Sequence, residues 1–275
     1  MKKSEIRKDY ILDRYVIIAP RRSKRPEQMK QTSLLITKDS PFTSNNLKQN
    51  RIIDSLGTGR EKVVTIGNLF PAVTLKNKHA YGTQEVIIDT PDSTFRQSDF
   101  SVDHLIGLFT MYARRVKALM KIPKINYILC LKNEGAAAGA SIQHEHSQIF
   151  ATSFVSPEIK AEAEKVRDYF HAHGTSFYSD VIKKEMKSAR RVYEDKYIAA
   201  FTPYASVFEY ELWIFSKRSV DNISALNKQE IISLAKILQK ILKKLKKLGL
   251  AYNYLSRQIV SDKHQHFCLK IEPRG

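Results

Sequence analysis

The residues with the clearest chemical potential lie in the stretch NEGAAAGASIQHEHSQIFAT, residues 133–152. His144, His146 and Gln148 stand two residues apart, so their side chains would share one face of an extended strand. A neutral imidazole is a good nucleophile toward a phosphorus atom near pH 7, and the phosphoramidate it forms can pass its group onward. The pattern predicts a two-step transfer in which His146 attacks, Gln148 donates to a phosphate oxygen, and the backbone at His144 orients the His146 ring.

The loop before these residues consists mainly of small side chains. Gly135 and Gly139 let backbone N–H groups come close to a bound anion, because glycine has no Cβ and adopts left-handed conformations readily. The N–H groups of residues 136–139 and the Ser141 hydroxyl are therefore expected to hold the charge that develops on the phosphoryl oxygens.

Two other interpretations of the histidine pair stay open. Alternating histidines are also typical of a half-buried polar face with a purely structural role. A metal site is the second alternative, because two imidazoles can coordinate zinc together. The carboxylates available to complete such a site are Glu145, Glu158 and Glu162.

Length and composition indicate a globular chain. It has 275 residues, 43% of them hydrophobic, which fits one large domain or two fused halves. The N-terminal segment lacks the features of a signal peptide, no apolar run is long enough to cross a membrane, and two cysteines cannot form a disulfide framework. We therefore expect a cytoplasmic protein without a membrane partner.

The formal net charge of +18 raises the question of nucleic acid binding. Many of the lysines fall on one side of a helix expected at 228–248, whose other side is apolar, and this arrangement is typical of a solvated helix face. These lysines are Lys236, Lys240, Lys243, Lys244, Lys246 and Lys247. Nucleic acid is therefore not expected to be the main partner.

Hydrophobic periodicity and turn signals predict the order of the elements. In the first half, strands are expected at 15–19, 62–66, 85–89 and 126–131 and across the histidine motif, with a helix at 102–120 capped by Ser101. Residues 27–60 are polar with little periodicity and are expected to be flexible. In the second half, we expect helices at 157–173, 179–189 and 228–248, strands within 191–201 and 208–215, and two final strands.

The two halves repeat one order of segments. EVIID and ELWIF each precede a long helix, which is followed by NYILCL or YNYLSR and then by HEHSQIF or HQHFCLKI. We therefore predict an α+β fold made of a duplicated module, with a mainly antiparallel sheet and flanking helices, divided into halves 1–152 and 153–275. The second half carries His266 and Cys268 where the first carries His146 and Gln148, so only the first half is expected to be catalytically complete.

Five motifs in order along the chain resemble the galactose-1-phosphate uridylyltransferase family, the HxHxQ branch of the histidine-triad superfamily. They are RYVIIAPRRSKRP, GNLFPAV, YGTQEVIIDTPD, NEGAAAGASIQHEHSQIFATSF and FTPYASVFEYELWIFSKR. The resemblance implies two histidine-triad-like modules, the second degenerate. It also implies an enzyme that moves a nucleoside monophosphate between a nucleotide sugar and a sugar 1-phosphate through a covalent nucleotidyl-histidine, and a homodimer.

The same resemblance implies roles for individual residues. His146 would carry the nucleotidyl group, Gln148 would bind the transferred phosphoryl group, and His144 would take part in catalysis by orienting His146. Asn68 would lie near the nucleoside, and the other matched residues would line the nucleotide and phosphate pocket. The implied substrate-binding set is Arg22, Arg25, Asn68, Asn133, Gly139 and Ser141.

The chain departs from the family at its metal sites. Many members carry a CPFC zinc pair where this chain has SPFT at 40–43, and a histidine where it has Gln84, so only His144 remains of four zinc ligands. Hydroxyl and amide groups bind zinc poorly compared with thiolate and imidazole. A second metal site would use Glu162 and a C-terminal HxH, which here reads HFC at 266–268. We expect no metal and no other cofactor.

Other functions stay open at this level. An adenylyltransferase or a nucleoside-diphosphate-sugar phosphorylase fits the same motifs, since they address phosphate and ribose more than base. A non-catalytic nucleotide- or RNA-binding protein is a different class of alternative. The sequence ends directly after its final strand, whereas family members commonly continue with a tail that reaches the sugar phosphate, so we expect nucleotidyl transfer to be retained and hexose selection to differ.

Overall fold

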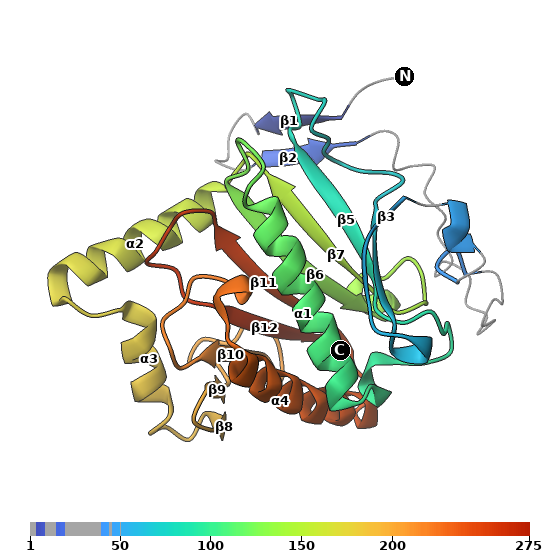
Figure 1. The fold of residues 1–275 in the computed structure, drawn as a ribbon. Helices are drawn as coiled ribbons and strands as arrows, with labels where there is room; N and C mark the ends of the chain where they lie inside the picture. Colours follow the sequence, from blue (N-terminus) through green and yellow to red (C-terminus); the bar gives the residue numbers. More distant parts are fainter. Residues whose placement is uncertain (1–3, 9–14, 20–39, 44–45, 50) are drawn as a thin grey trace.

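A computed structural model describes residues 4–8, 15–19, 40–43, 46–49 and 51–275. Its centre is a ten-stranded sheet in which neighbouring strands pair antiparallel (Figure 1). In spatial order the strands are β3 (Ile52–Leu56), β4 (Val63–Gly67), β5 (Gly82–Ile88), β7 (His146–Thr152), β6 (Tyr127–Glu134), β11 (Ala251–Ile259), β12 (Cys268–Arg274), β10 (Leu212–Ser216), β9 (Ile198–Phe201) and β8 (Arg191–Glu194). A separate hairpin joins β1 (Glu5–Lys8) to β2 (Tyr15–Ile18).

The strand order confirms the predicted duplicated α+β architecture. The first half contributes the order β3-β4-β5-β7-β6 and the second contributes β8-β9-β10-β12-β11, and the two sets meet where β6 pairs with β11. Along the chain, one long helix follows the third strand of each half: α1 (Val102–Leu119) lies between β5 and β6, and α4 (Lys228–Lys247) lies between β10 and β11. Both halves therefore place equivalent strands at equivalent positions of one continuous sheet.

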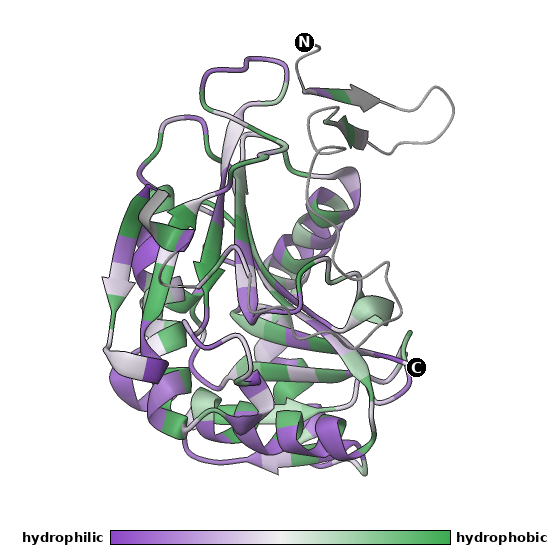
Figure 2. Cartoon of the chain, turned by 90° about the vertical axis from the view of Figure 1, so that its right-hand side faces the viewer, coloured by the Kyte–Doolittle hydropathy of each residue, from purple (hydrophilic) through white to green (hydrophobic). Residues whose placement is uncertain are grey.

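Helices α1 and α4 pack against each other on one face of the sheet (Figure 1). Ser101 caps α1 by accepting from the His104 N–H at 2.9 Å, and Asn227 and Glu230 form a capping box at the start of α4. The apolar side of α4 is buried in the main hydrophobic core, whereas its six lysines from Lys236 to Lys247 are exposed, as predicted. Figure 2 shows hydrophobic residues concentrated on the strands and hydrophilic residues in many of the outer loops.

The opposite face of the sheet differs between the halves. Cross-strand pairs put Gln148 on the same face as residues of every strand out to β9, namely Leu131, Leu255, Lys270, Trp213 and Phe201. In the second half this face is covered by α2 (Pro157–His173) and α3 (Phe177–Glu185), which pack Val166, Tyr178 and Ile182 onto it. In the first half it is partly covered by Phe42 and Leu47. The histidine strand therefore keeps an accessible face.

Several sequence expectations need correction. Residues 52–56 form the edge strand β3 within the stretch that was expected to be flexible, of which residues 27–39, 44–45 and 50 lie outside the described ranges. Strand β7 begins at His146, so His144 precedes it and does not share an extended face with it. Helix α3 begins at Phe177 and ends at Glu185, so it starts and stops a few residues earlier than the helix predicted at 179–189. Within the described ranges, no helix is long and apolar enough to cross a membrane.

Candidate active site around His146

His146 opens β7 and is held between β5 and the preceding loop. Its Nδ1 lies 2.8 Å from the His144 carbonyl oxygen. A carbonyl oxygen only accepts hydrogen bonds, so Nδ1 carries the proton and Nε2 keeps its lone pair. This is the backbone contact at His144 expected from the sequence, and it fixes both the tautomer and the orientation of the ring.

The environment keeps this imidazole neutral. Burial, and after it the positive charge of Lys132, lower the pKa of His146 to about 4. The side chain is 9% exposed, so it is desolvated without being sealed from the surface. A histidine in this state has an unprotonated nitrogen at neutral pH and is ready to act as a nucleophile.

Two cavities meet at His146. One, of about 260 Å³, is mostly polar and is lined by Leu131, Asn133, Gly139, Ala140, Ser141, His146, Gln148 and Phe150. The other, of about 100 Å³, is mostly apolar and is lined by Pro41, Phe42, Ile66, Asn68, Leu69, Phe70, Val86, Ser141, Ile142, His146 and Gln148. Ser141, His146 and Gln148 line both, so a ligand that spans the cavities must pass these three side chains.

Most of the predicted site residues are therefore brought together. His146, Gln148 and Ser141 lie at the junction, Asn133 and Gly139 line the polar cavity, and Asn68 lines the apolar one. Arg22 and Arg25 lie outside the described residues.

The amide of Asn133 is oriented by residues from the second half of the chain. Arg274 Nε donates to Asn253 Oδ1 at 2.7 Å, and Asn253 Nδ2 donates to the Ala138 carbonyl and to Asn133 Oδ1, both at 2.8 Å. Because Arg274 can only donate and a carbonyl can only accept, the orientation of Asn253 is determined. Asn133 must then turn its oxygen toward Asn253, which directs its NH2 group away from it. Sequence reasoning missed Asn253 and Arg274.

The small-residue loop works differently from the prediction. The N–H groups of Ala138 and Ala140 donate to the Gly135 carbonyl, and that of Gly139 donates to the Ala136 carbonyl. The N–H groups of residues 138 and 139 are thus used within the loop, so the anion cradle expected from residues 136–139 loses two of its four donors. Glycine is favoured at 139 by its backbone conformation, with φ +79°, since a Cβ there would make only ordinary contact with Asn133 Nδ2 at 3.9 Å.

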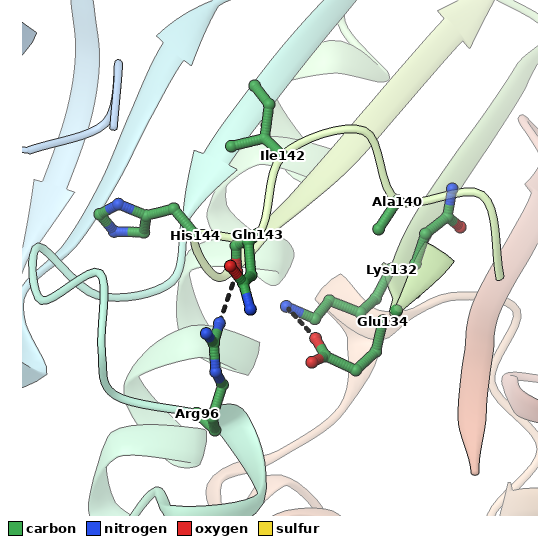
Figure 3. Close-up of a pocket in the computed structure, with 9 residues that line it drawn as sticks. Arg96, Lys132, Glu134, Ala140, Ile142, Gln143 and His144 are labelled. Carbon is green, nitrogen blue, oxygen red and sulfur yellow. Dashed lines mark hydrogen bonds and ion pairs between the residues drawn. The ribbon is translucent and has the colours of Figure 1, made fainter. Parts of the chain in front are cut away.

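A buried ion cluster lies behind the loop, and Figure 3 shows part of it around a small cavity of about 90 Å³. Lys132 is 1% exposed and pairs with Asp89 at 3.1 Å, with Glu134 at 3.7 Å and with Glu145. Arg96 Nη1 donates to the Gln143 carbonyl at 2.5 Å. These contacts tie β6, the segment after β5 and the loop before His146 into one unit.

Two acidic members of this cluster have raised pKa values and a third has a lowered one. Burial raises the pKa of Asp89 to about 6 even though Lys132 opposes it, and burial together with the charge of Glu145 raises that of Glu134 to about 8. The Lys132 charge holds the pKa of Glu145 below its usual value against the effect of burial. Glu134 is therefore mainly protonated at neutral pH, which reduces the net negative charge around Lys132.

The residues at the family's zinc position do not fit a zinc ion. His144 Nε2 donates to the Thr90 carbonyl at 2.6 Å, so its Nδ1 accepts from the Ser40 hydroxyl at 2.7 Å. Both ring nitrogens are thus engaged by the protein. Gln84 does not join His144 and Ser40, because it lies on β5 opposite Phe150 of β7 and six positions before Thr90 in the sequence. That part of the expected ligand set is wrong, and the geometry also disfavours a shared metal site of His144 and His146.

The second family metal position is also used for other contacts. Glu162 accepts from the Tyr178 hydroxyl at 2.8 Å and pairs with Arg257, while His266 Nε2 lies 2.7 Å from the Ser216 carbonyl. In the part of the chain that the structure describes, no three His, Cys, Asp or Glu side chains are grouped so as to hold a metal ion. The absence of a metal from the functional protein stays a prediction.

Comparison with known proteins agrees with this architecture. Residues 65–156 match the family description "Galactose-1-phosphate uridyl transferase, N-terminal domain" and residues 162–252 match "Galactose-1-phosphate uridyl transferase, C-terminal domain", which together span more than half of the chain.

Individual relatives cover most of the chain. An ADP-glucose phosphorylase of Arabidopsis thaliana is 26% identical over 91% of this chain and 77% of its own length. A galactose-1-phosphate uridylyltransferase of Thermotoga maritima is 26% identical over 89% of this chain and 76% of its own.

Solved structures share the fold. The crystal structure of an ADP-glucose phosphorylase from Arabidopsis thaliana with bound ADP-glucose superimposes with a TM-score of 0.77 and 25% identity, covering 98% of this chain and 89% of that one. A uridylyltransferase structure gives a TM-score of 0.81 at 24% identity over 98% of this chain and 86% of that one. The chain therefore belongs to the galactose-1-phosphate uridylyltransferase family and is a nucleotidyltransferase built on that scaffold.

Proposed function

We propose that this enzyme transfers a nucleoside monophosphate from a nucleotide sugar to a sugar 1-phosphate through a covalent intermediate on His146. The observation that carries the proposal is the proton placement on the ring. Nδ1–H is held by the His144 carbonyl, so the lone pair resides on Nε2 of a side chain that lines both cavities. His146 is the nucleophile, and His144 is a positioning residue.

The reaction has two balanced steps. In the first, Nε2 of His146 forms a bond to the α-phosphorus, the bond from that phosphorus to the bridging oxygen breaks, and the sugar 1-phosphate leaves with the electron pair. In the second, a phosphate oxygen of the acceptor attacks the same phosphorus and the N–P bond breaks, which returns the neutral imidazole. The negative charge of the α-phosphoryl oxygens is met by hydrogen-bond donors at the junction, chiefly the Gln148 amide and the Ser141 hydroxyl.

The two cavities provide different subsites for the substrate. The apolar cavity, with Phe42, Leu69 and Asn68 in its walls, suits a base and ribose. The polar cavity, with Asn133 and Gly139, suits the β-phosphate and the sugar. The α-phosphorus then lies between them, beside His146. The resemblance adds Arg22 and Arg25 as phosphate ligands.

The proposal also specifies the base of the nucleotide sugar and the acceptor of the nucleoside monophosphate. Uridine with a hexose 1-phosphate acceptor is the default, in line with the uridylyltransferase relatives. A phosphorylase that releases glucose 1-phosphate from ADP-glucose, with inorganic phosphate as acceptor, is a second candidate. It is favoured by the similarity to the Arabidopsis thaliana ADP-glucose phosphorylase in both sequence and structure.

We further propose that the enzyme works in the cytoplasm as a homodimer and needs no structural zinc. The Ser40 hydroxyl supports the proposal on zinc, because it donates a hydrogen bond to His144 Nδ1, the nitrogen that would have to bind a metal. The dimer is supported by the family resemblance.

The test uses nucleotide sugars radiolabelled in the α-phosphate and supplied without acceptor. Protein-bound label that is acid-labile and alkali-stable is expected with UDP-glucose or ADP-glucose, and the nucleotide that labels faster identifies the base. The labelled protein is then split into two samples that receive galactose 1-phosphate or inorganic phosphate, and the one that removes the label identifies the acceptor. If neither nucleotide labels the wild type more than His146→Ala, the transferase proposal fails.

A further inference from the structure

Gln84 contacts Gln148 directly, from the adjacent strand β5. Its Nε2 donates to Gln148 Oε1 at 2.8 Å, and its own Oε1 accepts from the Ala72 backbone N–H at 3.1 Å. Gln84 is 2% exposed, so its side of the contact is buried, while Gln148 is half-buried and faces the cavities. Sequence reasoning considered Gln84 only as a residue at a lost zinc position, but it lies far along the strand from Ser40 and His144 and beside Gln148 instead.

The hydrogen bonds determine the orientation of both amides. A carboxamide can rotate by half a turn and exchange its oxygen and nitrogen with little change of shape, so its orientation follows from its partners. The Ala72 N–H can only donate, and therefore Gln84 must present its oxygen to Ala72. Its NH2 group then points to Gln148, which must present its oxygen in return.

The consequence falls on the junction of the two cavities. With its oxygen held by Gln84, the Gln148 amide directs its NH2 group away from Gln84, and Gln148 is a lining residue of both cavities. Phosphoryl oxygens are acceptors without hydrogen atoms, so they attract an NH2 group and repel an amide oxygen. The wrong orientation of Gln148 would place a negative dipole where the phosphoryl charge develops.

We propose that Gln84 is a positioning residue for nucleotidyl transfer, which fixes the Gln148 amide with its NH2 group toward the phosphoryl oxygens. This inference rests on the proposed function, because it assigns Gln148 the role of phosphoryl donor. Gln84 itself does not touch the reacting atoms. Its effect reaches them through the orientation of Gln148, since a preorganised donor needs no rearrangement at the moment of reaction.

Two nearly isosteric substitutions separate orientation from packing. Gln84→Met fills the space but cannot hold the Gln148 oxygen, so the Gln148 amide becomes free to rotate. Gln84→Glu is assayed at about pH 8, where the new carboxylate is ionised and can only accept hydrogen bonds. It draws the NH2 group of Gln148 toward itself and turns the oxygen to the phosphoryl site. The expected order of transfer rates is wild type above Gln84→Met above Gln84→Glu.

The measurement is the release of sugar 1-phosphate from a labelled nucleotide sugar in a single turnover, as a function of nucleotide sugar concentration. We expect the maximal rate to fall about tenfold for Gln84→Met and about 100-fold for Gln84→Glu, with the half-saturating concentration changed much less, because the bond from Gln148 strengthens in the transition state. The matched control is Gln258→Met, a buried glutamine on β11 that lines neither cavity. It should react at the wild-type rate.

A double-mutant cycle tests whether Gln84 acts through Gln148. In a Gln148→Ala background, Gln84→Met should have no further effect on the maximal rate. Equal and independent losses in the two backgrounds would overturn the inference, as would a Gln84→Met rate equal to that of wild type, or failure of both Gln84 variants to fold. If the wild type itself releases no sugar 1-phosphate, the proposed function fails instead, so the two results are distinguishable.

Discussion

The low pKa of His146 predicts how the first half-reaction depends on acidity. The perturbation is a stepwise change of pH from 8 to about 4. Burial and Lys132 lower the pKa of the ring to about 4, so less than about 1% of the imidazole is protonated at pH 6.5, where an ordinary histidine would be half protonated. The rate of sugar 1-phosphate release should therefore be constant across the neutral range and should reach half of its plateau only at about pH 4.

The assay is a rapid-quench single turnover with a nucleotide sugar labelled in the sugar, because the released sugar 1-phosphate reports the first step without depending on the acid-labile intermediate. Asp89, with a pKa of about 6, titrates in the same range. Its protonation removes a negative charge beside Lys132 and so favours neutral His146 further. Fluorescence of Trp213 checks that the protein stays folded at each pH. A midpoint near 6.5, with the fold intact, would refute the assigned environment of the ring.

Three further predictions follow from the site and the cluster behind it. Gln148→Glu places a negative charge beside the transferred phosphoryl group, so it should lower the maximal transfer rate at least 100-fold while urea unfolding shifts little; comparable losses in both would make Gln148 merely structural. Lys132→Met leaves Asp89 buried without its cation and Glu145 with only Arg96 at 3.8 Å, so it should lower the free energy of unfolding by about 3–5 kcal/mol, and an unchanged urea midpoint would contradict the buried pairing. Protein purified without added metal should hold far less than one zinc per chain by elemental analysis and should keep its labelling activity in a chelator, whereas stoichiometric zinc would contradict the fit at His144.

Local sequence patterns predict the long helices and the duplicated sheet of this fold. The apolar spacing within α1 and α4, with Ser101 and Asn227 before them, predicts both helices because it depends only on neighbours along the chain. The repeated order of segments predicts the duplicated sheet, because the repeat can be recognised along the sequence itself. Strand β3 could not be predicted in this way, since it is a short, largely exposed edge strand that is defined by its pairing with β4.

The candidate site was predictable in its chemistry but not in its supporting contacts. Spacing and residue type indicate His146 and Gln148, yet nothing local shows that Gln84 holds the Gln148 oxygen or that Asn253 holds the Asn133 oxygen, because these partners lie 64 and 120 positions apart. Lys132 is a similar case. In a strand sequence a lysine is expected to reach solvent, but here tertiary structure buries it among carboxylates.

The same limit explains the error about the loop. Gly135 and Gly139 correctly indicate positive φ, at +85° and +79°. Whether an N–H group stays available to a ligand depends on how the loop closes, and here residues 136–138 form a turn of 3-10 helix that uses those of Ala138 and Gly139 internally. Composition predicts the conformational freedom of such a loop but not the partners of its N–H groups.

Mapping the attached nucleotide to a single residue shows directly whether His146 is the nucleophile. The protein is mixed with an excess of the preferred nucleotide sugar without acceptor, digested at alkaline pH, and analysed by tandem mass spectrometry alongside His146→Gln. We expect one nucleoside monophosphate per chain, bonded to the imidazole of His146 in the peptide that contains His144 and Gln148, and none in the variant. A modified peptide from elsewhere in the chain, or turnover of the nucleotide sugar with no protein-bound nucleotide, would contradict it.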